Sequence, residues 1–126
     1  GPHHCDIALE KVIDPILAAR PSTILFEAAN PRHEHEWEIW QAAGLADDKI
    51  LAPGLIDSCS NYVEHPELIR QRIERYTAFM GEDRVVASTD CGFGTFANYG
   101  KIDPVVTWMK LSALKDGAER ASRVAA

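Results

Sequence analysis

The segment Arg84-Val-Val-Ala-Ser-Thr-Asp-Cys-Gly-Phe-Gly-Thr95 gives the clearest indication of the fold. A short apolar run stops here at an acid and a thiol, Asp90 and Cys91, and then enters glycine-rich backbone. A parallel strand that is buried on both faces carries few polar positions along its length. We therefore expect a buried strand over residues 84–88 that presents Asp90 and Cys91 at its C-terminal end.

Two earlier stretches repeat this arrangement of an apolar run followed by an acid. Residues 22–26 form a run that stops at Glu27, and residues 49–52 lead through a Pro-Gly pair to Asp57. The carboxyl ends of parallel strands meet at one rim of a sheet, and sites are built at that rim. The three acids and the thiol are therefore expected to converge.

Helical patterns separate the three strands. Residues 6–20 carry apolar side chains at helical spacing, and Pro15 is expected to kink that helix. Helices are also predicted over 33–44, over 66–80 and from residue 104 towards the C-terminus. Each of these three helices follows one of the predicted strands.

The order of elements predicts an α/β fold, with one helix followed by three strand–helix units and no hairpin signal. Such alternation favours a parallel sheet with right-handed connections. The eight-stranded barrel built from this unit takes about 250 residues. A chain of 126 residues therefore fits a single domain, residues 1–126, that is about half of a (β/α)₈ TIM barrel.

Composition narrows the class of partner and compartment. The chain is 46% hydrophobic with a net charge of −6, which indicates a folded globular protein and disfavours nucleic acid, because phosphate binding needs a clustered basic face. Three widely spaced cysteines do not suggest a disulfide framework. We expect a cytoplasmic protein without a membrane span or a signal peptide.

A carboxylate and a thiolate at one rim suggest zinc, but a catalytic zinc site usually takes three protein ligands. His3 and Cys5 form a plausible two-ligand unit near the N-terminus. His33 and His35 lie two residues apart and cannot share one helical face, so a capping or surface role is favoured. His65, directly before a proline, is expected to be a loop or cap residue.

A purely structural role of the cysteines stays open beside the metal-binding role. A free cysteine is commonly a small buried hydrophobe, and this could hold for Cys91. Gly92 and Gly94 favour close backbone approach next to Cys91. Cys59 is interpreted as a loop thiol. No Gly-x-Ser-x-Gly nucleophile elbow occurs in the sequence, which disfavours an α/β hydrolase.

Three motifs resemble the C-terminal half of the cobalamin-independent methionine synthase family. They are Phe26-Glu-Ala-Ala-Asn-Pro-Arg-His-Glu-His-Glu-Trp37, Ala52-Pro-Gly-Leu-Ile-Asp57 and Ser88-Thr-Asp-Cys-Gly-Phe-Gly94. The likeness is greatest to the short single-barrel members, a group that includes the epoxyalkane:coenzyme M transferases, and it covers the chain to about Ala118.

The resemblance implies a (β/α)₈ barrel and a zinc site. Glu27 matches the family's acidic ligand and Cys91 matches its final thiolate. The family's His-x-Cys pair is expected just before Gly1, so His3 and Cys5 are interpreted as a decoy of that pair. No catalytic residue is assigned.

The implied chemistry is transfer of a methyl or alkyl group to a small thiol, either homocysteine-like or coenzyme M-like, that is held on zinc. With two of the expected ligands, the chain is predicted to be an inactive fragment of such a transferase. The alternative is a non-enzymatic half barrel. In both cases, uncovered sheet edges predict a homodimer or larger assembly.

Overall fold

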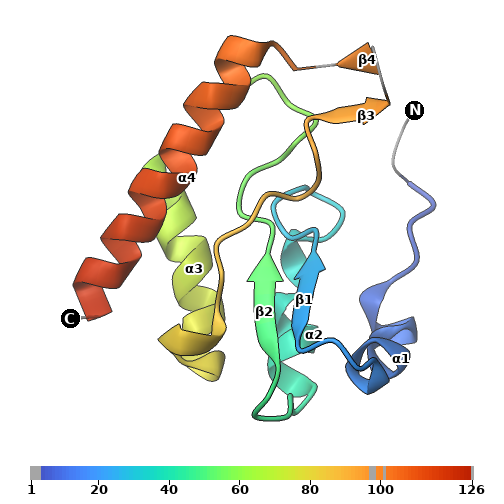
Figure 1. The fold of residues 1–126 in the computed structure, drawn as a ribbon. Helices are drawn as coiled ribbons and strands as arrows, with labels where there is room; N and C mark the ends of the chain where they lie inside the picture. Colours follow the sequence, from blue (N-terminus) through green and yellow to red (C-terminus); the bar gives the residue numbers. More distant parts are fainter. Residues whose placement is uncertain (1–3, 97–98, 101, 126) are drawn as a thin grey trace.

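The computed structural model describes residues 4–96, 99, 100 and 102–125 as a mixed fold of helices and strands (Figure 1). The helices are α1 (Ile13–Ala18), α2 (Trp37–Ala42), α3 (Pro66–Met80) and α4 (Pro104–Ala125), and the strands are β1 (Thr23–Phe26), β2 (Ile50–Pro53), β3 (Gly94–Phe96) and β4 (Tyr99–Gly100). Three 3₁₀ turns complete the order: η1 (Leu9–Lys11), η2 (Glu34–Glu36) and η3 (Glu82–Arg84). None of these helices is long and apolar enough to cross a membrane, as far as the described residues extend.

A small parallel sheet forms the centre of the molecule. Strands β1 and β2 pair in register from Thr23 opposite Ile50 to Phe26 opposite Pro53. Their arrowheads point towards the same edge of the molecule in Figure 1. The sequence predicted both of these strands to within one residue at each end, and their parallel pairing is confirmed.

The third predicted strand is present in a reduced form. Residues 85–88 run beside β2 through two isolated parallel bridges, between Leu51 and Val85 and between Gly54 and Ser88. The Ser88 N–H donates to the Pro53 carbonyl at 3.2 Å. The segment starts one residue later than predicted because Arg84 still belongs to the 3₁₀ turn η3.

The main core lies between the helices and one face of the sheet. The Phe26 ring packs on Trp40 of α2 with centroids 4.4 Å apart, and it meets Tyr76 of α3 at 5.8 Å. Strand residues alternate between the two faces of a sheet, so Leu25 points the other way and is 70% exposed. The helices described here therefore leave the opposite face of β1 uncovered.

Helices α3 and α4 pack closely around a second core of buried residues. Its members are Leu55, Ile56, Ile69, Ile73 and Ala113. At the crossing, a Cβ added to Gly117 would lie 2.6 Å from the Ile69 Cβ and 3.0 Å from the Pro66 carbonyl oxygen. The glycine is therefore required for the distance between the two helices.

The long first helix predicted over residues 6–20 is wrong. The helical part is shorter and consists of η1 and α1, separated by Val12 with a φ of −125°. Pro15 does not kink a helix, because it is the third residue of α1, where a backbone N–H would have no intrahelical partner in any case. Buried Lys49 closes the following turn by donating to the carbonyls of Ala19 at 2.7 Å and Pro21 at 3.0 Å.

The ends of the later helices follow the predicted local signals. The His65 side chain accepts from the Glu67 N–H at 3.1 Å, which confirms its role as a cap of α3. Gly81, with a φ of +82°, follows the last residue of α3. The Asp103 carboxylate accepts from the Val105 N–H at 2.7 Å at the start of α4.

An antiparallel hairpin of β3 and β4 was not predicted. Gly94 pairs with Gly100 and Phe96 with Tyr99, with an irregular register between the two pairs. Strands of three and two residues are too short to show an alternating pattern in a sequence. The absence of a hairpin signal therefore did not exclude a hairpin.

Replacing Gly117 by alanine is expected to destabilise the chain by up to about 2 kcal/mol. Alanine favours a helix by about 1 kcal/mol over glycine, but forcing a methyl group into a close-packed contact costs about 1–3 kcal/mol and requires movement of α3. Urea unfolding measures the difference. Asp116→Ala, at the exposed neighbouring position, is the control and should not destabilise; a Gly117→Ala variant as stable as this control would contradict the packing argument.

Candidate functional site

A cavity of about 380 Å³ lies beyond the C-terminal ends of the parallel strands. Its lining includes the three acids and the thiol that the sequence predicted to converge: Glu27, Asp57, Asp90 and Cys91. Their convergence at one rim is therefore confirmed. The remaining lining residues are Asn30, Pro31, Arg32, Ser58, Cys59 and Gly92.

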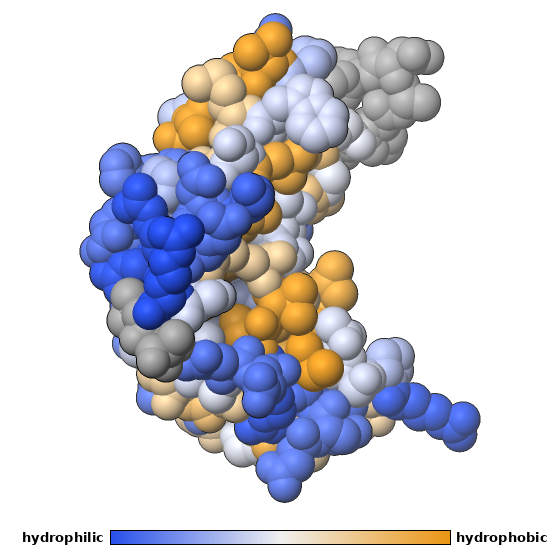
Figure 2. Space-filling view, turned by 60° about the vertical axis from the view of Figure 1, so that its left-hand side comes forward, coloured by the Kyte–Doolittle hydropathy of each residue, from blue (hydrophilic) through white to orange (hydrophobic). Residues whose placement is uncertain are grey.

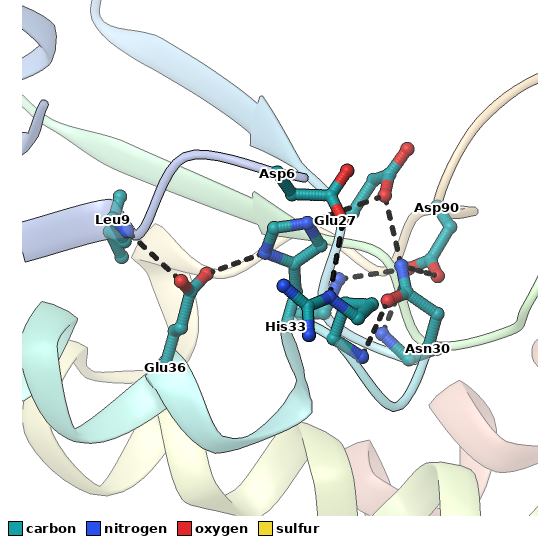
Figure 3. Close-up of polar contacts among 10 residues, drawn as sticks. Asp6, Leu9, Glu27, Asn30, His33, Glu36 and Asp90 are labelled. Atoms are coloured by element: carbon teal, nitrogen blue, oxygen red, sulfur yellow. Dashed lines mark hydrogen bonds and ion pairs between the residues drawn. The ribbon is translucent and has the colours of Figure 1, made fainter. Parts of the chain in front are cut away.

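Asp90 joins the loop after β1 to the end of the third strand segment. One carboxylate oxygen, Oδ1, accepts from the backbone N–H groups of Ala28 and Ala29, both at 2.8 Å. Figure 3 shows this carboxylate beside the labelled side chains of Glu27 and Asn30. The aspartate therefore supplies the acceptor for two N–H groups that the sheet itself leaves unpaired.

Gly54 makes this arrangement possible. A Cβ at this position would lie 2.6 Å from the Asp90 Cα and 2.7 Å from its backbone nitrogen, which is closer than atoms can approach without movement. The Asp90 N–H itself donates to the Ile56 carbonyl at 3.1 Å. The chain after β2 therefore passes directly against Asp90, between the two segments that Asp90 connects.

Asn30 holds two carboxylates with one amide group. Its Nδ2 donates to Glu27 Oε2 at 2.9 Å and to Asp90 Oδ2 at 3.0 Å (Figure 3). Its Oδ1 accepts from the Arg32 N–H at 3.0 Å, which fixes the orientation of the amide. Asn30 was not predicted as a site residue, although it stands in the quoted Phe26–Trp37 motif.

The environment of Asp90 has opposing effects on its carboxyl group. Burial raises the pKa because the charged form loses hydration, and the hydrogen bonds from Ala28, Ala29 and Asn30 lower it. The negative charge of Glu27 adds to the increase, and the pKa of Asp90 lies above its usual value. With both oxygens engaged, Asp90 serves as an organiser of the rim.

His33 is the N-cap residue of η2, and its ring lies between two carboxylates. Its Nδ1 is 2.8 Å from Glu36 Oε2, and its Nε2 is 3.9 Å from Glu27 Oε2. Glu36 is buried, and its other oxygen accepts from the Leu9 N–H at 3.0 Å (Figure 3). His33 occupies the predicted cap position, at the start of η2, but its side chain makes no cap hydrogen bond and contacts Glu36, three residues further on, which was not predicted. His35 is exposed, as expected.

Arg72 of α3 contacts the loops that form the same rim. Its guanidinium donates to the carbonyls of Leu55 at 3.0 Å and Ala29 at 3.4 Å, and to Glu34 at 3.1 Å. The side chain is 9% exposed. A single arginine therefore connects the loop after β1 with the loop after β2.

The residues that could hold a metal are incomplete within the described chain. Glu27 and Cys91 line one cavity and carry suitable oxygen and sulfur donors. Across residues 4–96, 99, 100 and 102–125, however, no three side chains of His, Cys, Asp or Glu are grouped so that they could hold an ion. Cys5 is exposed and is not part of the cavity lining, and His3 lies outside the described residues. The metal role of Glu27 and Cys91 stays a prediction.

The fold is of the α/β class, with helices packed against parallel strands. The candidate site lies at the carboxyl ends of these strands. No protein-family model matches the chain, and no curated protein matches it. Among solved structures, the fold is similar to a B12-independent methionine synthase from Shewanella sp. W3-18-1 in complex with selenomethionine. The TM-score is 0.73 at 24% identity, over 93% of this chain and 32% of that chain. The likeness establishes a shared fold.

Replacing Asp90 by alanine is expected to destabilise the chain by about 2–4 kcal/mol. The change removes the acceptor of two backbone N–H groups, and each part-buried donor left without a partner costs about 1–3 kcal/mol. Hydrogen exchange should show loss of protection at the Ala28 and Ala29 amides. Asp48→Ala, at an exposed position, is the control, and unchanged protection at residues 28 and 29 would contradict the role given to Asp90.

Proposed function

We propose that the chain is part of a zinc-dependent methyl or alkyl transferase that acts on a small thiol, and that it is inactive by itself. The observation that carries this proposal is the position of Glu27 and Cys91, which line one cavity beyond parallel strand ends. These are the two residues that match the zinc ligands of the cobalamin-independent methionine synthase family. The fold shared with a methionine synthase supports the same conclusion.

A partial (β/α)₈ barrel is the fold that this proposal requires. Strands β1 and β2 and residues 85–88 form three neighbouring parallel segments, with helices α2 and α3 against one face. A closed barrel has eight such strands around a packed interior. This chain corresponds to 32% of the similar methionine synthase chain, which is consistent with a segment of a barrel.

The cavity suits a small thiol substrate. When bound, zinc would lower the pKa of a thiol and provide a thiolate at neutral pH. Asn30 would hold the Glu27 carboxylate in place through its 2.9 Å hydrogen bond, as groups around metal ligands commonly do. Because the described residues supply two ligands and a catalytic zinc site usually takes three, the remaining ligands have to come from outside this set.

Cobalt(II), which can replace zinc and gives a visible signal with thiolates, tests the ligand assignment. The chain should bind cobalt weakly, with a thiolate charge-transfer band that disappears in Cys91→Ser and weakens in Glu27→Gln. Two ligands are expected to hold the ion less tightly than a complete site does. Cys5→Ser is the matched control, because Cys5 is also an exposed cysteine but does not line the cavity.

The proposal has two parts that experiments could contradict: the incomplete site and the ligand assignment. A single zinc ion held tightly through chelation, or methyl transfer to homocysteine by the chain alone, would show that the site is complete. A cobalt band that survives in Cys91→Ser would show that the ligand assignment is wrong. Cys59→Ser distinguishes a contribution from the second thiol in the cavity.

A second candidate function, self-association without catalysis, is favoured by the uncovered face of the sheet. Leu25 is 70% exposed and Val86 is 50% exposed. The register places Leu25 opposite Ala52, and Val86 beside Ala52, on the side away from the main core. Ala52 is only 2% exposed, so the exposed apolar surface of this row comes from Leu25 and Val86. Figure 2 shows apolar surface gathered around the hollowed part of the molecule. A second copy could cover this row and pair with the free strand edges.

Replacing Leu25 by lysine should shift a homodimer towards monomer. A charge on the sheet face would lose hydration on association, so dimerisation should weaken by a factor of ten or more. Light scattering at micromolar concentrations measures the change. Val105→Lys, at a similarly exposed apolar position on α4, is the control; a parent chain that is already a monodisperse monomer would contradict self-association.

A further inference from the structure

Lys110 of α4 is a lysine without exposure to solvent. Its side chain is 0% exposed, and its Nζ lies 2.7 Å from Glu64 Oε2, whose side chain is 1% exposed. The same ammonium donates to the Tyr62 carbonyl at 2.6 Å and lies 5.0 Å from the centre of the Tyr62 ring. Ser60 Oγ, at 3.5 Å, is the fourth contact. All of these partners belong to the loop between β2 and α3.

The other oxygen of Glu64 continues the contact towards the cavity. Glu64 Oε1 accepts from the Asp57 N–H at 2.8 Å, and Asp57 Oδ1 accepts from the Cys59 N–H at 2.8 Å. Asp57, Ser58 and Cys59 together form one wall of the cavity that Cys91 also lines. A series of hydrogen bonds therefore runs from the outer helix α4 to this wall.

Stability alone does not explain a buried ion pair. Removing two charges from water costs several kcal/mol per ion, and a well-packed apolar pair of similar volume is often as stable or more stable. What an apolar pair cannot supply is the acceptor for the Asp57 N–H. The carboxylate of Glu64 is therefore tied to the conformation of residues 57–59.

We propose that Lys110 and Glu64 are positioning residues for the 57–59 wall, the part of the cavity wall formed by Asp57, Ser58 and Cys59. Lys110 fixes the Glu64 carboxylate, and Glu64 fixes the Asp57 backbone, so that Asp57 and Cys59 stay at the cavity. The inference deepens the proposed function, on which it rests for the use of the cavity. Its test requires neither metal nor substrate.

Hydrogen exchange of the folded chain gives the rate at each backbone amide separately. The Cys5 amide, in an exposed residue outside the cavity lining, serves as the internal reference. In Lys110→Met the ratio of the Cys59 amide exchange rate to the Cys5 amide exchange rate should rise about fivefold, the change that about 1 kcal/mol produces, because the 57–59 wall is released and the Cys59 N–H loses its bond to Asp57 Oδ1. Lys115→Met, at a 74% exposed lysine of the same helix, should leave the ratio unchanged.

A double variant separates positioning from general stability. Lys110→Met with Glu64→Leu removes both charges and should unfold at a higher urea concentration than Lys110→Met, because no unpaired carboxylate stays buried. The Asp57 N–H still lacks its acceptor, so the Cys59 ratio should stay raised in the double variant. The single variant Glu64→Gln keeps a side-chain oxygen that can accept from the Asp57 N–H. Its Cys59 ratio should therefore lie close to the parent value.

A Cys59 ratio that returns to the parent value in the double variant would overturn the proposal, because the pair would then act through stability alone. Should Lys110→Met fail to fold, the double variant and Glu64→Gln decide the question. The result is also independent of the metal assignment. A parent chain that shows no Cys91-dependent cobalt signal would refute the proposed function and leave the hydrogen-exchange ratios unaffected.

Discussion

The two hydrogen bonds from Ala28 and Ala29 to one oxygen of Asp90 connect the ends of the structure's parallel segments. They span 62 and 61 residues of sequence and pass over the chain that follows β2, where Gly54 has no side chain to obstruct them. The isolated bridges of residues 85–88 are a weak ladder by themselves. The aspartate compensates by attaching the third segment to the first at the point where the sheet ends.

This constraint gives the acids of the rim different tasks, although they occupy similar positions in the sequence. Asp90 is partly buried and uses both oxygens within the protein. Glu27 retains a 39% exposed side chain at the cavity and receives one amide hydrogen bond. Asp57 caps its own turn by accepting from the Cys59 N–H. Of the three, Glu27 has the environment of a residue that can bind something from solution.

Local signals in the sequence predicted much of the fold. The β1 and β2 strands, the Pro66 start of α3 and the Asp103 cap of α4 each depend on a few neighbouring residues, and each is confirmed. The first helix was wrong because its apolar spacing also fits a 3₁₀ turn followed by a short helix. The convergence of the rim residues followed from topology, but the functions of Asn30, Arg72 and Lys110 depend on partners up to 60 residues away. No local pattern encodes such contacts.

Arg72 has a consequence for the motions of the rim. Its three hydrogen-bond partners belong to the loops after β1 and β2 and to the turn η2, while the residue itself lies in the middle of a 15-residue helix. Parts of a protein open at different free energies, and segments that share contacts open together. Movement of either loop away from α3 therefore requires that hydrogen bonds to Arg72 break. A ligand entering the cavity would meet a rim that is already in place.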